Sequence, residues 1–552
     1  MAVDRALGFK IKTFTSKPNQ IYMKRKFIYT CFSFLFFSTL GLPSFAQFTL
    51  TGQLRTRTEV RSGYGNLVPS GSKPAAFTSM RTRLVFGYKW DRITFGASIQ
   101  DVRVWGQDAS SISNADGSRL MLHEGWTDIV LANKTDTTFK FKLLDQLSLK
   151  IGRQELIYDD VRLIGNLDWL QQARRHDMAL LKVLHHGWQV DLGYAFNQNG
   201  DAAGVTGTSY VPGNIPAYVK NSVGVLVPTP GGIVPLTAGG SMANSSSKTG
   251  APAYSNPVST NGANQNYKSF TSLYISRKFN QTKFSGLFFN DRFGKYKMDS
   301  SSVAGGYVYG RRFVSSGTAD TYDYSGTNDR YTYGLMINHT LGNASGFGKV
   351  AIQAAYYKQS GKNRDGVDLD AIHYSVLATY QKGRFSVTPG YDVLSGNDAV
   401  KISTKDNRFD PLYGTPHRHW GYMDYFYAGT GSPAGGLNNI YFKTKYASNL
   451  LIITADYHNF SLNEDMKKGD GAVIGKDLGN EFDFTLNYTL NKFTQVEAGY
   501  SLMKATSSMP FAKGQATTDA IANSFSKTGN WFYLMINIRP DFFYAKPVAI
   551  KQ

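Results

Sequence analysis

Hydrophobic and polar residues alternate strictly along many segments of this chain. The clearest segment is 481–490, in which the even-numbered residues are apolar and the odd-numbered residues are polar. After a two-residue connection, the alternation resumes at 493–504. Successive side chains of a β-strand point to opposite faces, so each of these segments has one apolar and one polar face. The pattern predicts two antiparallel strands joined by a tight turn.

The same alternation recurs along the chain and predicts about eighteen strands of roughly ten residues, the length that a tilted strand needs to cross a bilayer. The predicted strands are 47–60, 77–89, 93–105, 120–131, 146–155, 174–184, 188–197, 267–279, 282–293, 330–341, 348–358, 371–381, 384–394, 437–446, 449–460, 481–490, 493–504 and 530–540. Short turns and long polar connections alternate between them, as in outer-membrane proteins with short periplasmic turns and long outer loops. The predicted fold class is therefore all-β: a single transmembrane antiparallel β-barrel of about eighteen strands, with both termini on the periplasmic side.

The longest connection, 198–266, is rich in Gly, Ser, Asn, Thr and Pro and carries almost no charge. Such a composition is typical of a disordered surface loop. The alternative is a loop that folds over the mouth of the pore. The sequence shows no internal repeat and predicts no second domain.

A secretory signal precedes the predicted strands. Residues 23–26 read Met-Lys-Arg-Lys, an apolar run continues to Leu42, and small residues before the expected cleavage site end at Ala46. A transmembrane anchor is the alternative, but Ser and Thr interrupt the run and a cleavage site ends it. The expected organisation is a mis-assigned start extension at 1–22, a signal peptide at 23–46 and an outer-membrane barrel at 47–552, located in the outer membrane of a Gram-negative bacterium.

Composition narrows the possible partners and chemistry. Cys31 is the only cysteine and lies in the signal, so the mature chain would have no disulfide, no thiolate metal site and no cysteine nucleophile. The 34 Tyr and 36 Phe suit the aromatic girdles of a barrel. Residues 1–46 carry seven of the 60 basic and one of the 40 acidic side chains, which leaves a net charge of about +14. Because an exported protein does not meet its genome, we expect an anionic solute and outer-membrane lipid or lipopolysaccharide as partners, and no nucleic acid.

The charge of the inward-facing residues is the main chemical feature of the predicted barrel. The polar faces of the first two predicted strands carry four arginines, Arg55, Arg57, Arg81 and Arg83. An arginine that faces lipid at the bilayer midplane costs about 2–4 kcal/mol, so we expect all four to point into the lumen. Guanidinium groups in a narrow lumen would raise the local concentration of anions. Alternatively, these arginines fill the barrel as structural ion pairs, with Glu59, Asp101 or Glu155 as partners.

A charged and aromatic segment at 152–177 interrupts the strand alternation. His176 and Asp177 are adjacent in it, but neighbouring strand residues point to opposite faces and cannot form one acid–base dyad. Irregular backbone at membrane depth survives only inside protein or against water, so we expect part of the segment to fold into the barrel and narrow the channel. Its aromatic faces would stack on sugar rings while its guanidinium holds a carboxylate. The side chains expected along the path are Tyr158, Arg162 and Trp169.

Two parts of the chain resemble a known family. The first contains Gly-Arg-Gln-Glu at 152–155, the run 162–166 and Gln-Gln-Ala-Arg-Arg-His-Asp at 171–177; the second is Phe-Asp-Pro-Leu-Tyr-Gly-Thr-Pro-His-Arg at 409–418. These motifs are similar to those of the alginate export family of outer-membrane barrels. The resemblance implies an 18-stranded barrel with an arginine-rich constriction that passes an anionic polysaccharide. By motif match, the constriction would include Arg153, Arg175 and Arg418.

The function predicted from these features is an outer-membrane channel with an arginine-rich lumen. It would pass an anionic, alginate-like, uronate-containing polysaccharide or oligosaccharide by diffusion and act as a monomer. The alternative is a general carbohydrate or small-anion porin, which would usually trimerise. A hydrolase is not expected, because the chain has no Gly-x-Ser-x-Gly and no His-Glu-x-x-His motif; no cofactor or metal is expected either. The candidate substrate-binding residues are Arg55, Arg57, Arg81, Arg83, Arg153, Tyr158, Arg162, Trp169, Arg175 and Arg418.

Overall fold

A computed structural model of the chain describes residues 47–106, 120–135, 143–197, 216–231, 233–238, 241–242, 251–252, 267–313, 326–343, 346–427 and 433–543. The expected start extension, signal peptide and much of the 198–266 connection lie outside these residues. The chain divides into two compact units, Met1–Gln47 and Phe48–Gln552, and the fold below is that of the second.

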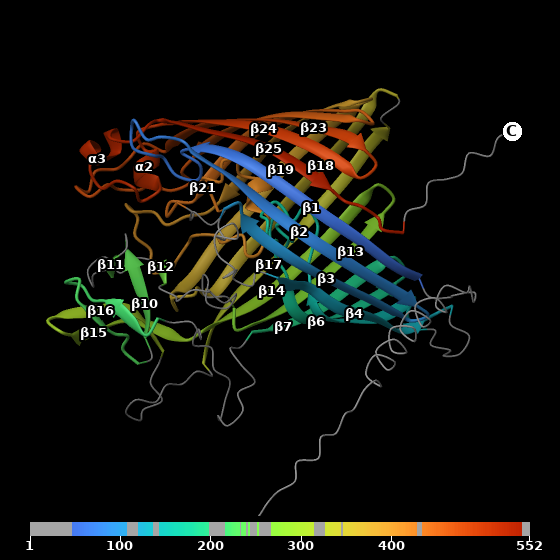
Figure 1. Ribbon diagram of the computed structural model, residues 1–552, viewed down its shortest axis with the longest axis horizontal. Coiled ribbons are helices and arrows are strands. Elements are labelled where there is room, and N and C mark those ends of the chain that lie inside the picture. Colours follow the sequence, from blue (N-terminus) through green and yellow to red (C-terminus); the bar gives the residue numbers. More distant parts are fainter. Residues whose placement is uncertain are drawn as a thin grey trace, which may run out of the picture. The chain divides into compact units, whose positions relative to one another are not determined.

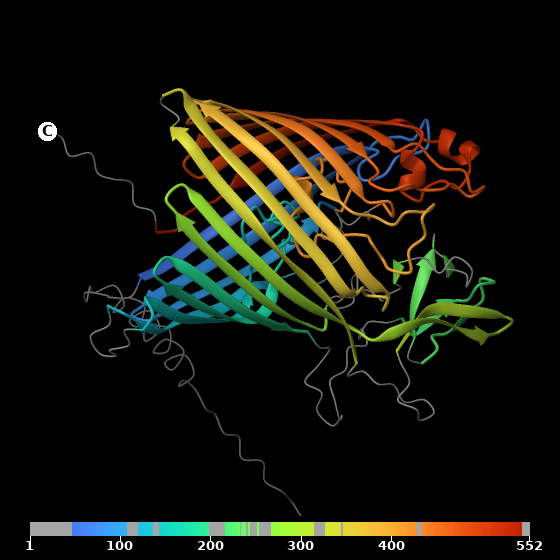
Figure 2. The ribbon, with the colours of Figure 1, turned by 180° about the vertical axis from the view of Figure 1, so that it is seen from behind.

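Eighteen strands form one closed antiparallel barrel (Figures 1 and 2). Each strand pairs with the next barrel strand along the chain, and β1 also pairs with β25, which closes the sheet. The barrel strands are β1 (Gln47–Ser62), β2 (Ala75–Trp90), β3 (Ile93–Val104), β4 (Met121–Asn133), β5 (Gln146–Gln154), β6 (His176–His185), β7 (Trp188–Phe196), β13 (Ser269–Phe279), β14 (Thr282–Gly294), β17 (Thr327–Asn343), β18 (Gly348–Lys362), β19 (Asp368–Lys382), β20 (Phe385–Leu394), β21 (Leu437–Ala447), β22 (Leu451–Ser461), β23 (Asp477–Asn491), β24 (Thr494–Ala505) and β25 (Thr528–Ile538). The eighteen predicted strands are confirmed, with ends that shift by a few residues.

The two faces of the barrel wall follow the alternation in the sequence. On β23, Phe482 is 45% exposed on the outer surface, whereas its neighbour Glu481 is fully buried on the inner side. On β1, Leu54 and Arg55 differ in the same way, with 38% and 3% of their surfaces exposed. The outer face is apolar as a bilayer requires, and closure of the sheet satisfies the backbone hydrogen bonds within the wall. The protein is thus an outer-membrane β-barrel. Among the described residues, no helix is long and apolar enough to cross a bilayer.

Tight turns gather at one end of the barrel and long loops at the other. The turns after β6 and β13 place His186 and Asn280 at positive φ, each at 49°. Two-residue hairpin turns favour such left-handed backbone, because its twist matches that of the flanking strands. The end with tight turns faces the periplasm and the end with long loops faces outward, as the predicted asymmetry requires.

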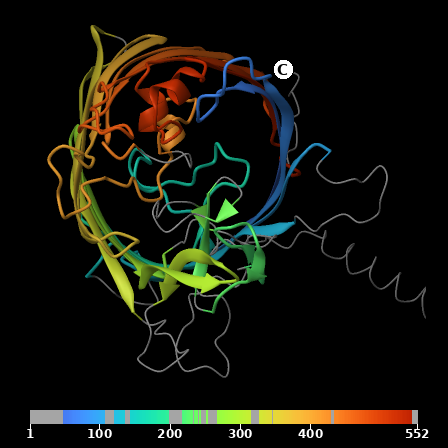
Figure 3. The same cartoon turned by 90° about the vertical axis from the view of Figure 1, so that its left-hand side faces the viewer.

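Two of the outer loops fold into the barrel. Figure 3 looks from the end that carries the long loops and shows the teal loop between β5 and β6 inside the ring of strands. We call residues 155–175 the first inward loop and residues 397–427 the second. The loops join in a short parallel ladder, in which Gly165 N donates to Tyr413 O and Thr415 N donates to Val161 O. A side chain at Gly414 would meet the Arg162 carbonyl oxygen at 1.9 Å, so this close approach requires glycine.

The sequence analysis missed a small sheet in the outer loops. β15 (Tyr296–Val303) and β16 (Gly306–Phe313) form a hairpin within the predicted 294–329 connection, and β16 continues to β10 (Ile233–Ala238). The pairing of β10 with β16 joins segments far apart in sequence and leaves no local periodicity to detect. The remaining elements are β8 (Tyr218–Lys220), β9 (Leu226–Pro228), β11 (Ser241–Met242), β12 (Ala251–Pro252), the 3₁₀ helix η1 (Pro416–Arg418), α2 (Met509–Ala512) and α3 (Asp519–Asn523).

Candidate functional site

Asp168 of the first inward loop joins two arginines of the barrel wall. Its carboxylate lies 2.9 Å from Arg81 Nη2 and 3.3 Å from Arg55 Nη1. Burial alone would raise the pKa of Asp168, but the charges of Arg81 and Arg55 hold this pKa below its usual value. Both guanidinium groups are almost fully buried under the loop. The strand arginines therefore point inward, as predicted, but they anchor the loop instead of meeting open lumen.

Arg57 anchors the same loop through Trp169. Its Nη1 donates to the Trp169 carbonyl at 2.9 Å, and its guanidinium lies 4.2 Å from the centre of the indole ring. Its Nε also donates to Glu59 Oε1 at 2.8 Å. This ion pair with Glu59 is the structural alternative considered for the arginines, and it places Arg57 in the barrel core. We correct the expectation that Arg55, Arg57 and Arg81 contact a solute, because the inward loop covers them.

Arg162 is the most deeply buried charge of the first inward loop. Its Nη1 lies 2.5 Å from Asp392 of β20, and its Nε lies 3.1 Å from Asp160. Although burial lowers the pKa of Arg162, the two carboxylates raise it above its usual value. Arg162 was expected along the solute path, but it is only 2% exposed and both ion pairs face protein. It holds the loop to the wall, and a solute cannot reach its guanidinium.

The second inward loop packs against the first through aromatic rings. Trp169 stacks on His417 with ring centres 4.3 Å apart, and His417 stacks on Tyr422 at 5.0 Å. His417 Nδ1 lies 2.8 Å from Asp424 Oδ1, which also fixes the imidazole. Trp169 is only partly exposed, because the Arg57 guanidinium and the His417 ring both lie over its indole.

Tyr158 has a similar structural contact on the other side of the first inward loop. Its ring stacks on Tyr274 of β13 at 4.2 Å, and its hydroxyl donates to Asp191 at 3.1 Å. The residue is half-buried. Tyr158 is therefore held against the barrel wall by Tyr274 and Asp191.

Arg153 lies on the opposite side of the barrel wall from the lumen. It shares the outward face of β5 with Ile151, which is 42% exposed, whereas Gln154 is buried inward. Its guanidinium forms two 2.8 Å contacts with Asp177. The place in the constriction that the family resemblance implied for Arg153 is therefore wrong, because strand phase turns it outward. Asp177 points outward and His176 inward to Tyr267, so these neighbours do not form a dyad.

Three candidate arginines have no carboxylate partner at ion-pair distance among the described residues. Arg83 donates to Gln100 Oε1 at 2.7 Å and is half-buried. Arg175 donates to Met121 Sδ at 3.4 Å and is also half-buried, and Arg418 of η1 is exposed. Burial and the nearby charge of Arg153 lower the pKa of Arg175. These three arginines, which we call the open arginines, are the candidates left for contact with an anion.

The sequence analysis did not select a set of inward lysines nearer the periplasmic end. They are half-buried, and three have a carboxylate within about 3 Å: Lys182 with Asp128, Lys283 with Asp159 and Lys443 with Asp456. The fourth, Lys150, lies 3.8 Å above the Trp126 ring. For Lys150, Lys283 and Lys443 the signal is present in the sequence, because each shares the polar phase of its predicted strand.

One group of inward side chains has the residue types of a metal site. His123 Nε2 lies 3.1 Å from Glu155 Oε1, and Glu124 lies beside them. Glu155 also accepts from Asn166 Nδ2 at 2.7 Å, and Glu124 accepts from the backbone of Glu155. These mutual hydrogen bonds satisfy the carboxylates. The group therefore needs no metal ion, and it anchors the start of the first inward loop.

Comparisons with known proteins agree with the expected family. Residues 47–195 match the family model described as alginate export, which agrees with the resemblance indicated by the motifs. No curated protein matches the chain in sequence. Solved structures of similar architecture include OpdO of Pseudomonas aeruginosa, at 12% identity over 90% of this chain and 98% of that chain with a TM-score of 0.49. Another is OccAB1 of Acinetobacter baumannii, at 12% identity over 90% and 97% of the two chains with a TM-score of 0.49.

Proposed function

We propose that this outer-membrane channel of the alginate export family passes an anionic, uronate-containing saccharide chain by diffusion, past the two inward loops. The observation that carries the proposal is the set of open arginines. Arg83, Arg175 and Arg418 keep exposed surface, and each retains charge that no described carboxylate neutralises at ion-pair distance. The family name alone indicates the solute class, and these arginines provide the matching chemistry.

The arrangement suits a flexible anionic chain better than a small anion held at one point. Guanidinium groups bind carboxylates through paired hydrogen bonds, and the three open arginines offer such groups at separate positions of the chain. The inward lysines continue the positive charge towards the periplasmic end, although three of them already contact carboxylates. Attraction at several separated points speeds entry without trapping the solute, as conduction requires.

The proposal is tested by single-channel recording in planar bilayers. The wild type is compared with the triple variant Arg83→Ser/Arg175→Ser/Arg418→Ser, and Arg153→Ser serves as the control for an outward charge. We expect anion preference in the wild type, a weaker preference in the triple variant and no change in the control. The difference should shrink from 0.1 M to 1 M salt, because the screening length falls from about 10 Å to about 3 Å.

Block by added saccharides separates the two candidate functions. Uronate oligomers should block the wild type more strongly than neutral oligomers of equal length, and the triple variant should lose this difference. Equal block by both would favour a general carbohydrate porin. Cation preference of the wild type at low salt would contradict the proposal.

A further inference from the structure

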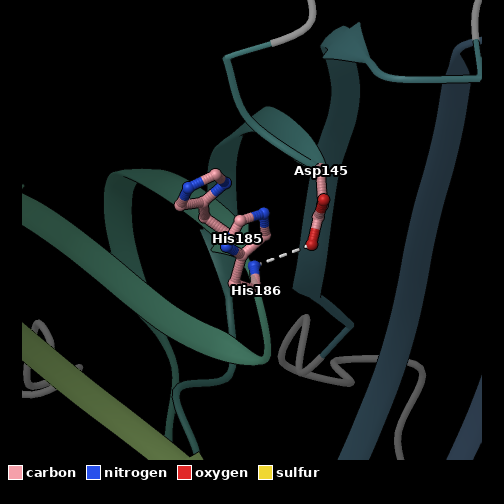
Figure 4. Close-up of side chains that lie close together, drawn as sticks. All are labelled: Asp145, His185 and His186. Atoms are coloured by element: carbon pink, nitrogen blue, oxygen red, sulfur yellow. Dashed lines mark hydrogen bonds between the residues drawn. The ribbon is translucent and has the colours of Figure 1, made fainter.

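We propose that Asp145, His185 and His186 form a binding site for a divalent transition-metal ion at the periplasmic rim of the barrel. The three side chains come from two neighbouring connections: Asp145 precedes β5, and the histidines end β6 and begin its tight turn (Figure 4). Their nearest nitrogen and oxygen atoms all lie within 4.8 Å of one another.

Backbone hydrogen bonds fix the two connections against each other. Asp145 N donates to the Leu184 carbonyl at 2.9 Å, and His186 N donates to Asp145 Oδ2 at 2.8 Å. The carboxylate is therefore held next to the turn before any ion arrives. A site whose ligands are already positioned loses less conformational freedom on binding.

The turn explains why two adjacent histidines meet. In a regular strand, consecutive side chains point to opposite faces. His186 instead has left-handed backbone with φ of 49°, which brings its ring alongside that of His185. The ring centres lie 4.0 Å apart at an interplanar angle of 18°. Figure 4 shows the two rings next to each other.

His185 also has a nitrogen that lacks a partner. Its Nδ1 is buried and makes no hydrogen bond to any described residue. Buried polar atoms are normally hydrogen-bonded, and each exception requires an explanation. A metal ion would supply the missing partner, since neutral imidazole nitrogens are common metal ligands.

The donor set selects a class of ion. Two imidazoles and one carboxylate suit Zn²⁺ and other late first-row divalent ions, with water in a fourth position. Bonds of about 2 Å in a tetrahedral site would place the ligand atoms roughly 3.3 Å apart. Rotation of the exposed His186 ring can close most of the difference. Lys134 lies 2.8 Å from Asp145 Oδ1 and would compete with the ion for this carboxylate.

The test uses the mature barrel, purified without a polyhistidine tag and folded in detergent. Zn²⁺ binding is measured by calorimetry, and Co²⁺ is added as a spectroscopic probe of coordination geometry. We expect one ion per chain, with the visible absorption of four-coordinate Co²⁺. His185→Ala and Asp145→Asn should each weaken binding by more than roughly tenfold.

Two further variants make the result specific. His339→Asn removes a histidine that is hydrogen-bonded to Thr282, at the same end of the barrel and outside the cluster, and should leave binding unchanged. Lys134→Ala removes the competitor for Asp145 and should tighten binding. Heat-modifiable migration on gels shows that each variant folds. Failure of the wild type to bind, or equal binding by wild type and His185→Ala, would overturn the proposal.

Discussion

The lumen holds two groups of arginines that differ in environment. The covered arginines, Arg55, Arg57, Arg81 and Arg162, are at most 3% exposed, and each lies within 3.3 Å of a carboxylate oxygen. The open arginines Arg83, Arg175 and Arg418 keep exposed surface, and none of them lies at ion-pair distance from a described carboxylate. Arg83 and Arg175 donate to neutral acceptors instead.

The difference shows that an inward-facing residue is not necessarily accessible to a solute. Strand phase turns a side chain towards the lumen, but a loop that folds inward can cover it. A covered charge needs a partner, because an unpaired charge loses its hydration without compensation. The covered arginines therefore hold the inward loops in place, and we propose that the open arginines are the ones that meet a solute.

Removal of Arg162 should have the largest effect on stability. Arg162→Ala would leave Asp392 and Asp160 buried without their cation, which typically costs 3–5 kcal/mol. We expect a lower free energy of unfolding in urea and a larger single-channel conductance, because the first inward loop loses its attachment. Arg418→Ala is the matched control and should change stability by no more than about 0.5 kcal/mol. Equal stability of the two variants would remove the distinction between covered and open arginines.

Replacement of Asp168 should have a smaller effect of the same kind. Asp168→Asn keeps the shape and one hydrogen-bonding oxygen but removes the charge shared by Arg55 and Arg81. We expect a loss of roughly 1–3 kcal/mol in unfolding free energy, the usual cost of leaving a buried group unsatisfied. Asp101→Asn breaks a pair with Arg103, whose side chain is far more exposed than those of Arg55 and Arg81, and should cost about 0.2–1 kcal/mol. A larger loss for Asp101→Asn would contradict this ranking.

The last prediction concerns pH dependence and Lys513, a covered cation of the outer loops whose ammonium donates to the Tyr425 carbonyl. Burial lowers its pKa to about 7, although Asp424 partly opposes the shift. In the unfolded chain the lysine keeps its proton up to about pH 10.4, so the unfolded state binds more protons between these values. The free energy of unfolding should therefore rise with pH from about 7 to about 10. Below pH 7 the buried ammonium is fully charged, and its destabilising effect is then at its maximum.

The comparison of unfolding free energies at pH 6.5 and pH 9.5 tests this prediction. Lys513→Met should reduce the rise seen in the wild type, because it removes the titrating group. Lys504→Met alters an exposed lysine of β24 and should keep the wild-type rise. A rise that persists unchanged in Lys513→Met would show that other groups cause it.

The sequence by itself determined the barrel. Apolar and polar residues must alternate along each lipid-facing strand, because one side meets hydrocarbon and the other meets the lumen. This pattern therefore predicts the number of strands, the direction of each side chain and the positions of the turns. It also located the irregular 152–177 segment, because alternation fails there. Even Arg153 shared its strand phase with Ile151 in the sequence, and the structure confirms that this phase turns it outward.

Only the tertiary structure decided which inward charges remain available. Asp168 meets Arg55 and Arg81, Arg162 meets Asp392, and the two inward loops meet in one ladder, across separations of more than a hundred residues in most cases. Such pairings leave no local periodicity, since they depend on where a loop turns back inside the barrel. The same holds at the periplasmic rim, where a left-handed turn joins His185 and His186 to Asp145. Alternation reports the environment of each strand face, whereas contacts between distant loops depend on the closed fold.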